Sequence, residues 1–149
     1  MNLSECLSRI EPQSAKWREA ARDHIRSLTM PRWALGRLLD LAVDLAGISR
    51  RIDFPVARKK IVLMAGDHGV VAEKVSPQPQ CVTVQMLRNF SRGGGAIRVL
   101  AANAGADVRL VDLGVNADVR ELPGVIHRKI AFGTENMRRG PAMSRAQAL

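Results

Sequence analysis

The chain has 149 residues, of which 46% are hydrophobic, and this is enough material for the buried core of one domain. No apolar run approaches the length of a membrane span, and the first residues lack the basic and apolar stretches of a secretory signal. We therefore expect a cytoplasmic protein with no membrane partner.

The charge of the chain is strongly positive. Lys and Arg number 23 against 14 Asp and Glu, which gives a formal net charge of +9. Such a balance is typical of proteins that bind nucleic acid or another polyanion. The basic residues are scattered along the chain, however, and only three Phe and two Trp are present to stack on bases. We expect no nucleic-acid partner, and a basic nucleic-acid-binding domain remains the less favoured alternative.

Two amphipathic helices are predicted near the start of the chain. Ser14 is a suitable N-cap for the first helix, whose apolar positions Trp17, Ala21, Ile25 and Leu28 recur at helical spacing. Pro31 is expected to open the second helix and Gly47 to end it. The apolar stripe of that helix comprises Leu35, Leu38, Leu39, Ala42 and Leu45. These patterns predict a small N-terminal helical unit over residues 1–54.

The pattern changes to alternating strands and helices over residues 55–149. In residues 60–65, Lys60 is followed by five apolar residues without alternation, which predicts a strand buried on both faces. Further strands are predicted over 108–113 and 125–131. Helices are predicted over about 80–91, with Val82, Met86 and Phe90 on one face, and over 96–104. This order predicts an α/β fold in which a parallel sheet is covered by helices.

The last residues form the beginning of a helix. Ser144 and Gln147 have the spacing of a capping box, yet the chain stops at Leu149, before two turns can form. We therefore expect a truncated chain cut from a longer protein, with a frayed tail as the alternative reading.

The segment after the first predicted strand is the candidate ligand loop. Residues 64–79 read MAGDHGVVAEKVSPQP and place Asp67 and His68 between glycines at the tip of a strand, where α/β proteins keep ligand sites. A general acid–base pair, half of a metal site and a hydrogen-bonded loop are all compatible with this pair. Neighbouring residues on an extended chain point apart, so we expect Asp67 to fix the loop through backbone N–H groups and His68 to face the cleft.

Other candidate sites have weaker patterns. His24 and His127 show no ligand spacing to His68, and Cys6 and Cys81 form no CxxC pair, so we expect no metal and no disulfide framework. Residues 93–95 are three glycines that follow a helix and match no phosphate fingerprint, which favours a turn between helices. Asp112 ends a strand, as does the ribose-binding carboxylate of dinucleotide folds, but no glycine fingerprint accompanies it.

Several blocks in a fixed order carry a family resemblance. The chain contains DHGV at 67–70, VSPQPQCVTVQM at 75–86, NFSRGGGAI at 89–97, AGAD at 104–107 and VDLGV at 111–115, followed by GTEN at 133–136 and GPAMSRAQA at 140–148. From about residue 30 to its end, the chain resembles the nicotinate-nucleotide–dimethylbenzimidazole phosphoribosyltransferases of cobalamin synthesis. We expect it to correspond to their N-terminal portion only.

The resemblance implies a fold and a reaction. Members of this family carry the active site on a Rossmann-like parallel sheet joined to a small helical domain, form homodimers, and need no cofactor. They transfer phosphoribose from nicotinate mononucleotide to 5,6-dimethylbenzimidazole, which yields α-ribazole 5′-phosphate and nicotinate. The loop at 64–79 resembles one wall of their base-binding pocket.

The resemblance also implies roles for four residues. Ser76 and Gln85 match the polar positions that flank the benzimidazole, and Asp67 and His68 match the block that shapes the pocket. The catalytic glutamate of the family lies outside these 149 residues, and neither Glu73 nor Glu135 stands in its motif. No catalytic residue is therefore expected in this chain, and a base-binding remnant without catalysis is the alternative function.

Overall fold

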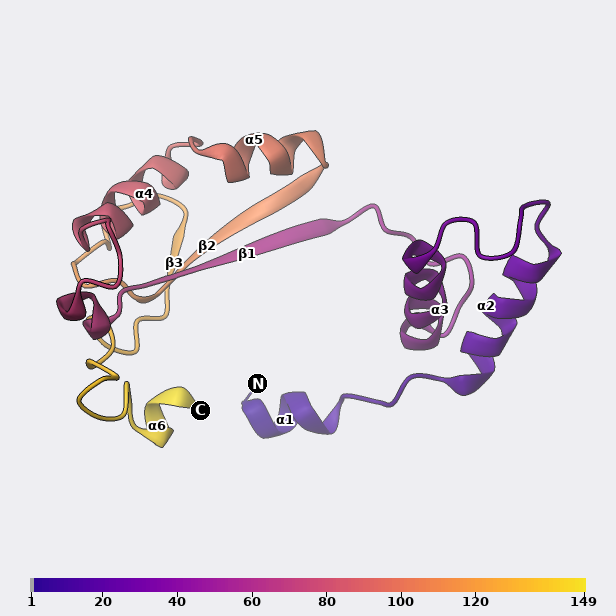
Figure 1. Ribbon diagram of the computed structural model, residues 1–149, viewed down its shortest axis with the longest axis horizontal. Helices are drawn as coiled ribbons and strands as arrows, with labels where there is room; N and C mark the ends of the chain where they lie inside the picture. The colour runs from indigo at the N-terminus through magenta and orange to yellow at the C-terminus, as the bar shows by residue number, and fades with distance from the viewer. Residues whose placement is uncertain (1) are drawn as a thin grey trace. The chain divides into compact units, whose positions relative to one another are not determined.

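The structure is a computed structural model and describes residues 2–149. The chain divides into two compact units, Met1–Val56 and Ala57–Leu149, which are coloured indigo to purple and magenta to yellow in Figure 1. Each unit has its own buried core.

The first unit contains three helices, α1 (Leu3–Ser8), α2 (Ala15–Ser27) and α3 (Arg37–Ser49). As predicted, α2 begins after Ser14, whose hydroxyl oxygen accepts the Trp17 N–H. α2 and α3 pack together through small and β-branched side chains, namely Ala21, Val43 and Ala46, with Ile25 against them. The short α1 has a capping box of Asn2 and Glu5 and was not predicted from the sequence.

Helix α3 differs from its prediction at both ends. It begins at Arg37 and not at Pro31, because Gly36 takes a left-handed φ of 52° that interrupts helical geometry. It also continues through Gly47 to Ser49, and the C-cap residue Arg50 takes the left-handed conformation common at a helix terminus. Gly47 is instead a packing position, because a Cβ there would lie 2.7 Å from Cγ of Arg18 on α2.

The predicted apolar stripe of α3 was partly wrong. Leu39, Val43 and Ala46 are buried against the unit's core, whereas Leu35 and Leu38 are exposed. Since Leu35 precedes the first residue of α3, it does not share the helical spacing on which the stripe was based.

The second unit is built on a three-stranded sheet, which confirms the predicted α/β class. Strands β1 (Lys59–Gly66), β2 (Ala106–Gly114) and β3 (Val125–His127) lie in the order β1-β2-β3, and both pairings are parallel. The register places Leu63 beside Leu110, which in turn lies beside Val125. The third strand is shorter than the predicted 125–131.

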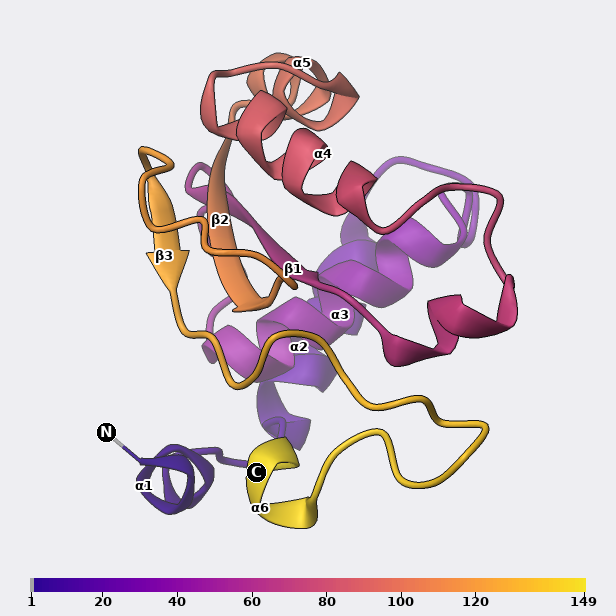
Figure 2. The same ribbon diagram turned by 90° about the vertical axis from the view of Figure 1, so that its left-hand side faces the viewer.

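Helices α4 (Cys81–Ser91) and α5 (Ala96–Asn103) lie on the same face of this sheet (Figure 2). The core between them and the strands includes Ala65, Leu87, Leu110, Val115, Val119, Leu122 and Val125. Leu87 is the buried residue of α4, while Met86, which the prediction placed on one face with Val82 and Phe90, is exposed. The short η1 (Gly69–Glu73) and α6 (Arg145–Ala148) lie in the segments that follow the strands.

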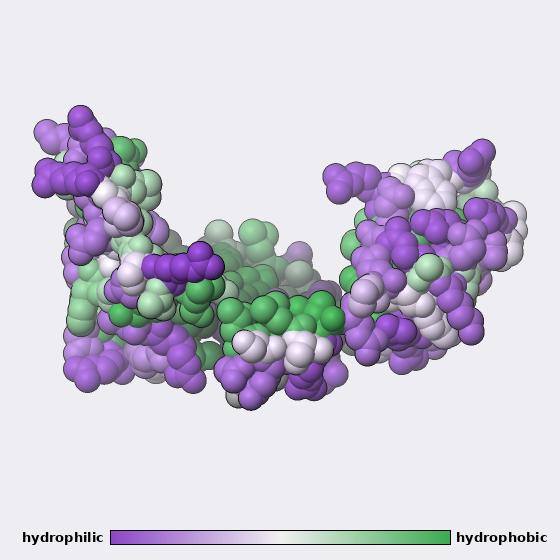
Figure 3. All heavy atoms as spheres, turned by 90° about the horizontal axis from the view of Figure 1, so that it is seen from below, coloured by the Kyte–Doolittle hydropathy of each residue, from purple (hydrophilic) through white to green (hydrophobic). Residues whose placement is uncertain are grey.

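The opposite face of the sheet carries exposed apolar side chains, so the prediction that β1 is buried on both faces was wrong. Val62 and Met64 of β1 are 49% and 65% exposed, and Met64 lies in register with Val111, which is paired with Ile126. Figure 3, in which apolar residues are green, shows such side chains gathered along this strand. Within residues 2–149, no helix has the length and apolar character needed to cross a membrane.

Candidate functional site at the carboxyl ends of the strands

The loops that follow the three strands meet at one edge of the sheet. Asp67 follows β1, Val115 and Asn116 follow β2, and residues 128–135 follow β3. The carboxyl ends of parallel strands are the usual place for ligands in open α/β sheets, because the loops there converge from several strands. This edge is therefore the candidate site.

Asp67 holds these loops together. Its N–H donates to the Gly114 carbonyl at 2.9 Å, and its own carbonyl accepts the Thr134 N–H at 3.0 Å. Its carboxylate Oδ2 accepts the Asn116 N–H at 2.7 Å. Asp67 is buried, and its contacts join the segments after all three strands, so its carboxylate fixes a backbone N–H as expected from the sequence.

A small cavity of about 240 Å³, which we call the Ser76 cavity, opens beside Asp67. Its apolar wall consists of Val70, Val71, Val75, Pro79 and Val82. Its polar groups come from Asp67, His68, Ser76, Gln78, Gln80 and Thr83. This is a largely apolar slot with a few hydroxyl and amide groups, the usual composition of a small-molecule site.

A second cavity of about 330 Å³ lies next to the first, and we call it the Ile130 cavity. Met64, Leu113 and Ile130 contribute to its lining, together with Thr134 and Gln147 from the last part of the chain. Gly66, Asp67 and His68 line both cavities. The segment that the sequence singled out thus forms the wall common to the two.

The structure brings three of the four sequence-predicted site residues together. Asp67, His68 and Ser76 line the Ser76 cavity, where the Ser76 hydroxyl oxygen accepts the Gln78 N–H at 3.1 Å. Gln85 does not line it and is exposed on α4. Gln85 is nevertheless three residues after Val82, a lining residue, and residues at this spacing are neighbours on a helix surface.

Sequence reasoning missed the anchor of η1. The carboxylate of Glu73 accepts a hydrogen bond from Asn136 Nδ2 at 2.8 Å and forms ion pairs with Arg138 and Arg139. These contacts fix η1 to the segment after β3. Asn136 belongs to the GTEN block, but nothing in the sequence pairs it with a glutamate 63 residues earlier.

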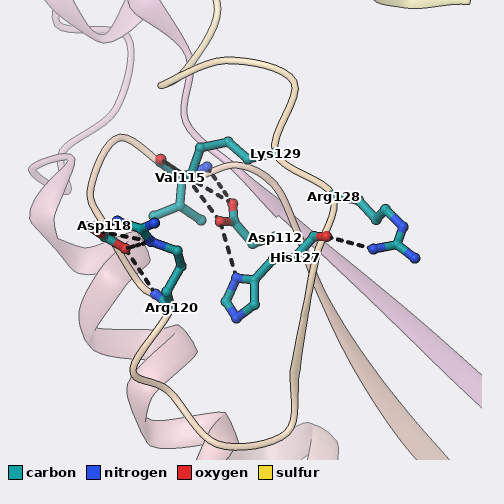
Figure 4. A network of polar contacts seen from close by, with 7 residues as sticks. All are labelled: Asp112, Val115, Asp118, Arg120, His127, Arg128 and Lys129. Carbon is teal, nitrogen blue, oxygen red and sulfur yellow. Dashed lines mark hydrogen bonds and ion pairs between the residues drawn. The ribbon is translucent and has the colours of Figure 1, made fainter.

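Asp112 is not open to a ligand, so its weak ribose-binding pattern is not supported. Its side chain is 1% exposed, and Lys129 Nζ lies 3.0 Å from Oδ2 and 3.2 Å from Oδ1 (Figure 4). His127 Nδ1 lies 3.8 Å from Oδ2, and these two buried atoms have no aligned hydrogen-bond partner. In the described part of the chain, no three His, Cys, Asp or Glu side chains gather as a metal-binding group.

A parallel sheet with helices on one face and cavities at its carboxyl edge defines an α/β protein of the Rossmann-like class. Comparison with known proteins is more specific. The model of one family, described as Phosphoribosyltransferase, matches residues 10–149, and the chain belongs to this family.

Named relatives agree with this assignment. The nicotinate-nucleotide–dimethylbenzimidazole phosphoribosyltransferases of Desulfotalea psychrophila and Syntrophotalea carbinolica are each 50% identical to this chain over 150 residues. The alignments cover 99% of this chain and 42% of each relative, so the chain spans about two-fifths of their length. The crystal structure of the enzyme of that name from Thermus thermophilus has a TM-score of 0.84 and 41% identity, covering 91% of this chain and 41% of the other.

Proposed function

We propose that this chain takes part in the transfer of phosphoribose from nicotinate mononucleotide to 5,6-dimethylbenzimidazole, a step in the assembly of the cobalamin nucleotide loop. The products are α-ribazole 5′-phosphate and nicotinate. The observation that carries this proposal is the 50% identity to two relatives of that name across 99% of the chain. The contribution of these 149 residues is the binding of the base.

The chemistry of the Ser76 cavity supports base binding. In the reaction, one ring nitrogen of the benzimidazole bonds to the anomeric carbon of the ribose as the bond to nicotinate breaks. A carboxylate takes the proton from the second ring nitrogen. The base is flat and apolar apart from its two nitrogens, and the valine-rich wall with the hydroxyls of Ser76 and Thr83 matches that description. The volume of about 240 Å³ is below the roughly 300–1,000 Å³ of sites for drug-sized ligands, as suits a small base.

The roles proposed for the individual residues are those that the family resemblance implies. Ser76 and Gln85 bind the base, and Asp67 and His68 shape the cavity. The proton acceptor is the family's catalytic glutamate, for which no residue of this chain is proposed. We further propose a cytoplasmic homodimer without cofactor or metal, and a boundary between helical unit and α/β domain after residue 54.

Titration of the purified chain with 5,6-dimethylbenzimidazole, followed by calorimetry, tests the proposal. We expect saturable binding at one site and a loss of about 2- to 13-fold in affinity for Ser76→Ala, the equivalent of one hydrogen bond. Ser27→Ala is the matched control, because Ser27 is also exposed with a single local backbone contact, at the end of α2. Absence of binding, or equal losses in both variants, would contradict the assignment of the cavity.

Turnover separates binding from catalysis. With nicotinate mononucleotide and base both saturating, we expect the chain alone to make no detectable α-ribazole phosphate. General-base catalysis contributes about 10²–10⁴-fold, and the residue proposed to supply it is absent from these 149 residues. Turnover close to that of a full-length relative would show that the proton acceptor lies in this chain.

A further inference from the structure

The loop after β2 is held by the ion pair between the buried Asp112 and the half-buried Lys129. Val115 is fully buried, and both of its backbone polar groups bind this pair. The Val115 N–H donates to Asp112 Oδ1 at 3.0 Å, and its carbonyl accepts from Lys129 Nζ. Figure 4 shows Asp112 and Lys129 converging on Val115, and we call these three residues the Val115 clamp.

The residue after the clamp connects two lining residues of the Ser76 cavity. Asn116 donates its backbone N–H to Asp67 Oδ2 at 2.7 Å and its side-chain amide to Gln80 Oε1 at 3.2 Å. Asp67 follows β1, and Gln80 immediately precedes α4. Asn116 therefore fixes the separation of two walls that come from different elements.

We propose that Asp112 and Lys129 are positioning residues for base binding, acting through Asn116. By fixing both polar groups of Val115, the clamp sets the position and orientation of the next peptide unit. Only with that orientation does Asn116 reach Asp67 and Gln80 together. This inference rests on the proposed function, since it assigns the Ser76 cavity to the base.

The geometry excludes direct contact as the route. Asp112 is 1% exposed, and neither Asp112 nor Lys129 lines the Ser76 cavity. Lys129 is itself held in place, since its Nζ lies 4.6 Å from the centre of the Phe132 ring as well as beside Asp112. The contacts of the clamp connect both residues to the cavity through Val115 and Asn116, in the loop between β2 and β3.

The test uses the 149-residue chain and two readouts, calorimetric affinity for 5,6-dimethylbenzimidazole and hydrogen exchange of the Asn116 amide by NMR. For Lys129→Met we expect about 2- to 13-fold weaker base binding, as for one lost hydrogen bond, and faster Asn116 exchange. Asp112→Asn/Lys129→Met is the second variant, because it leaves no uncompensated buried charge and retains an acceptor for Val115 N–H. It should show the same two changes.

A matched control and a double-mutant cycle make the result decisive. Asp118→Asn removes an exposed ion pair with Arg120 from the same loop and should change neither readout. Asn116→Ala removes the side-chain amide bound to Gln80 and keeps the backbone N–H bound to Asp67. If Lys129 acts through Asn116, the double variant Lys129→Met/Asn116→Ala should therefore lose less affinity for the base than the two single losses multiplied. Losses that multiply in the double variant, or unchanged base affinity in a folded Lys129→Met chain, would overturn the proposal.

Failure of the proposed function gives a different result. If the unaltered chain does not bind the base, the assigned ligand is wrong. Hydrogen exchange of the Asn116 amide then tests by itself whether Asp112 and Lys129 position Asn116. Unchanged exchange in both clamp variants would then overturn the positioning role.

Discussion

The N–H of Gly69 donates to the carbonyl oxygen of Thr134 over 3.0 Å, so that η1 begins directly against the segment after β3. A Cβ at residue 69 would lie 2.6 Å from that oxygen and 2.7 Å from the backbone nitrogen of Asn136. These are backbone atoms, which cannot turn aside as a side chain can. Glycine is therefore required where the candidate ligand loop contacts the last part of the chain.

Replacement of this glycine should destabilise the second unit. We expect Gly69→Ala to lower the free energy of unfolding by about 1–3 kcal/mol, because the added methyl group forces a backbone shift. Gly140→Ala is the control, since a Cβ at residue 140 would meet no atom within 4 Å. Urea unfolding of the unaltered chain, Gly69→Ala and Gly140→Ala measures the difference in stability. Equal midpoints would show that the backbone around residue 69 accommodates the methyl group without loss of stability.

The core between the sheet and its covering helices can be tested with one leucine from each helix. Leu87 on α4 is 1% exposed and belongs to the core of the sheet, whereas Leu100 on α5 is 66% exposed. We expect Leu87→Ala to cost about 2–5 kcal/mol of stability and Leu100→Ala less than about 0.5 kcal/mol. Thermal unfolding of both variants provides the comparison. Similar losses would mean that α4 does not pack on the sheet as described.

The parallel sheet was predictable from the sequence because apolar residues dominate the middle of β1 and β2 and because the helices α4 and α5 separate these two strands. The predicted burial of β1 on both faces was wrong, because the pattern of apolar residues does not show whether another element covers each face of the sheet. Residues 60–65 have the composition of a strand covered on both faces, yet Val62 and Met64 are exposed. The predicted start of α3 was wrong for a local reason, because Pro31 begins a turn and Gly36 interrupts helical geometry.

The candidate site was predictable only where its residues are close in sequence. Asp67, His68 and Ser76 lie within ten residues of one another and line one cavity. The contacts that shape this cavity join residues far apart in the chain, such as Asp67 with Asn116 and Glu73 with Asn136. Neither spacing nor residue type identifies such pairs before the strands are placed side by side.

Gln85 remains a predicted base-binding residue, and its position makes the prediction specific. Since Gln85 is one helical turn beyond Val82, a base that reaches it must extend from the Ser76 cavity along α4. We expect Gln85→Ala to weaken binding of 5,6-dimethylbenzimidazole by about 2- to 13-fold, the loss of one neutral hydrogen bond. In a full-length relative, the same change should leave affinity for nicotinate mononucleotide unaltered. Unchanged base affinity by calorimetry would remove Gln85 from the site.

The loop between β2 and β3 also contains Asp118, a carboxylate whose pKa is lowered. Hydrogen bonds from the Arg120 side chain, and then from its backbone, hold the pKa of Asp118 well below the ordinary 3.8. A lowered native pKa stabilises the fold above the unfolded pKa, and this contribution is lost as pH falls through the native value. NMR titration should find the Asp118 pKa below 3.8 in the unaltered chain and closer to it in Arg120→Gln. An unshifted Asp118 would contradict the ion pair.

The wall shared by the two cavities has a thermodynamic consequence. Gly66, Asp67 and His68 separate the Ser76 cavity from the Ile130 cavity, so any displacement of this wall changes the shape of both. A ligand that moves the wall from one side therefore alters the affinity for a ligand on the other side. Linkage requires the effect to be reciprocal, with each occupant changing the dissociation constant of the other by the same factor.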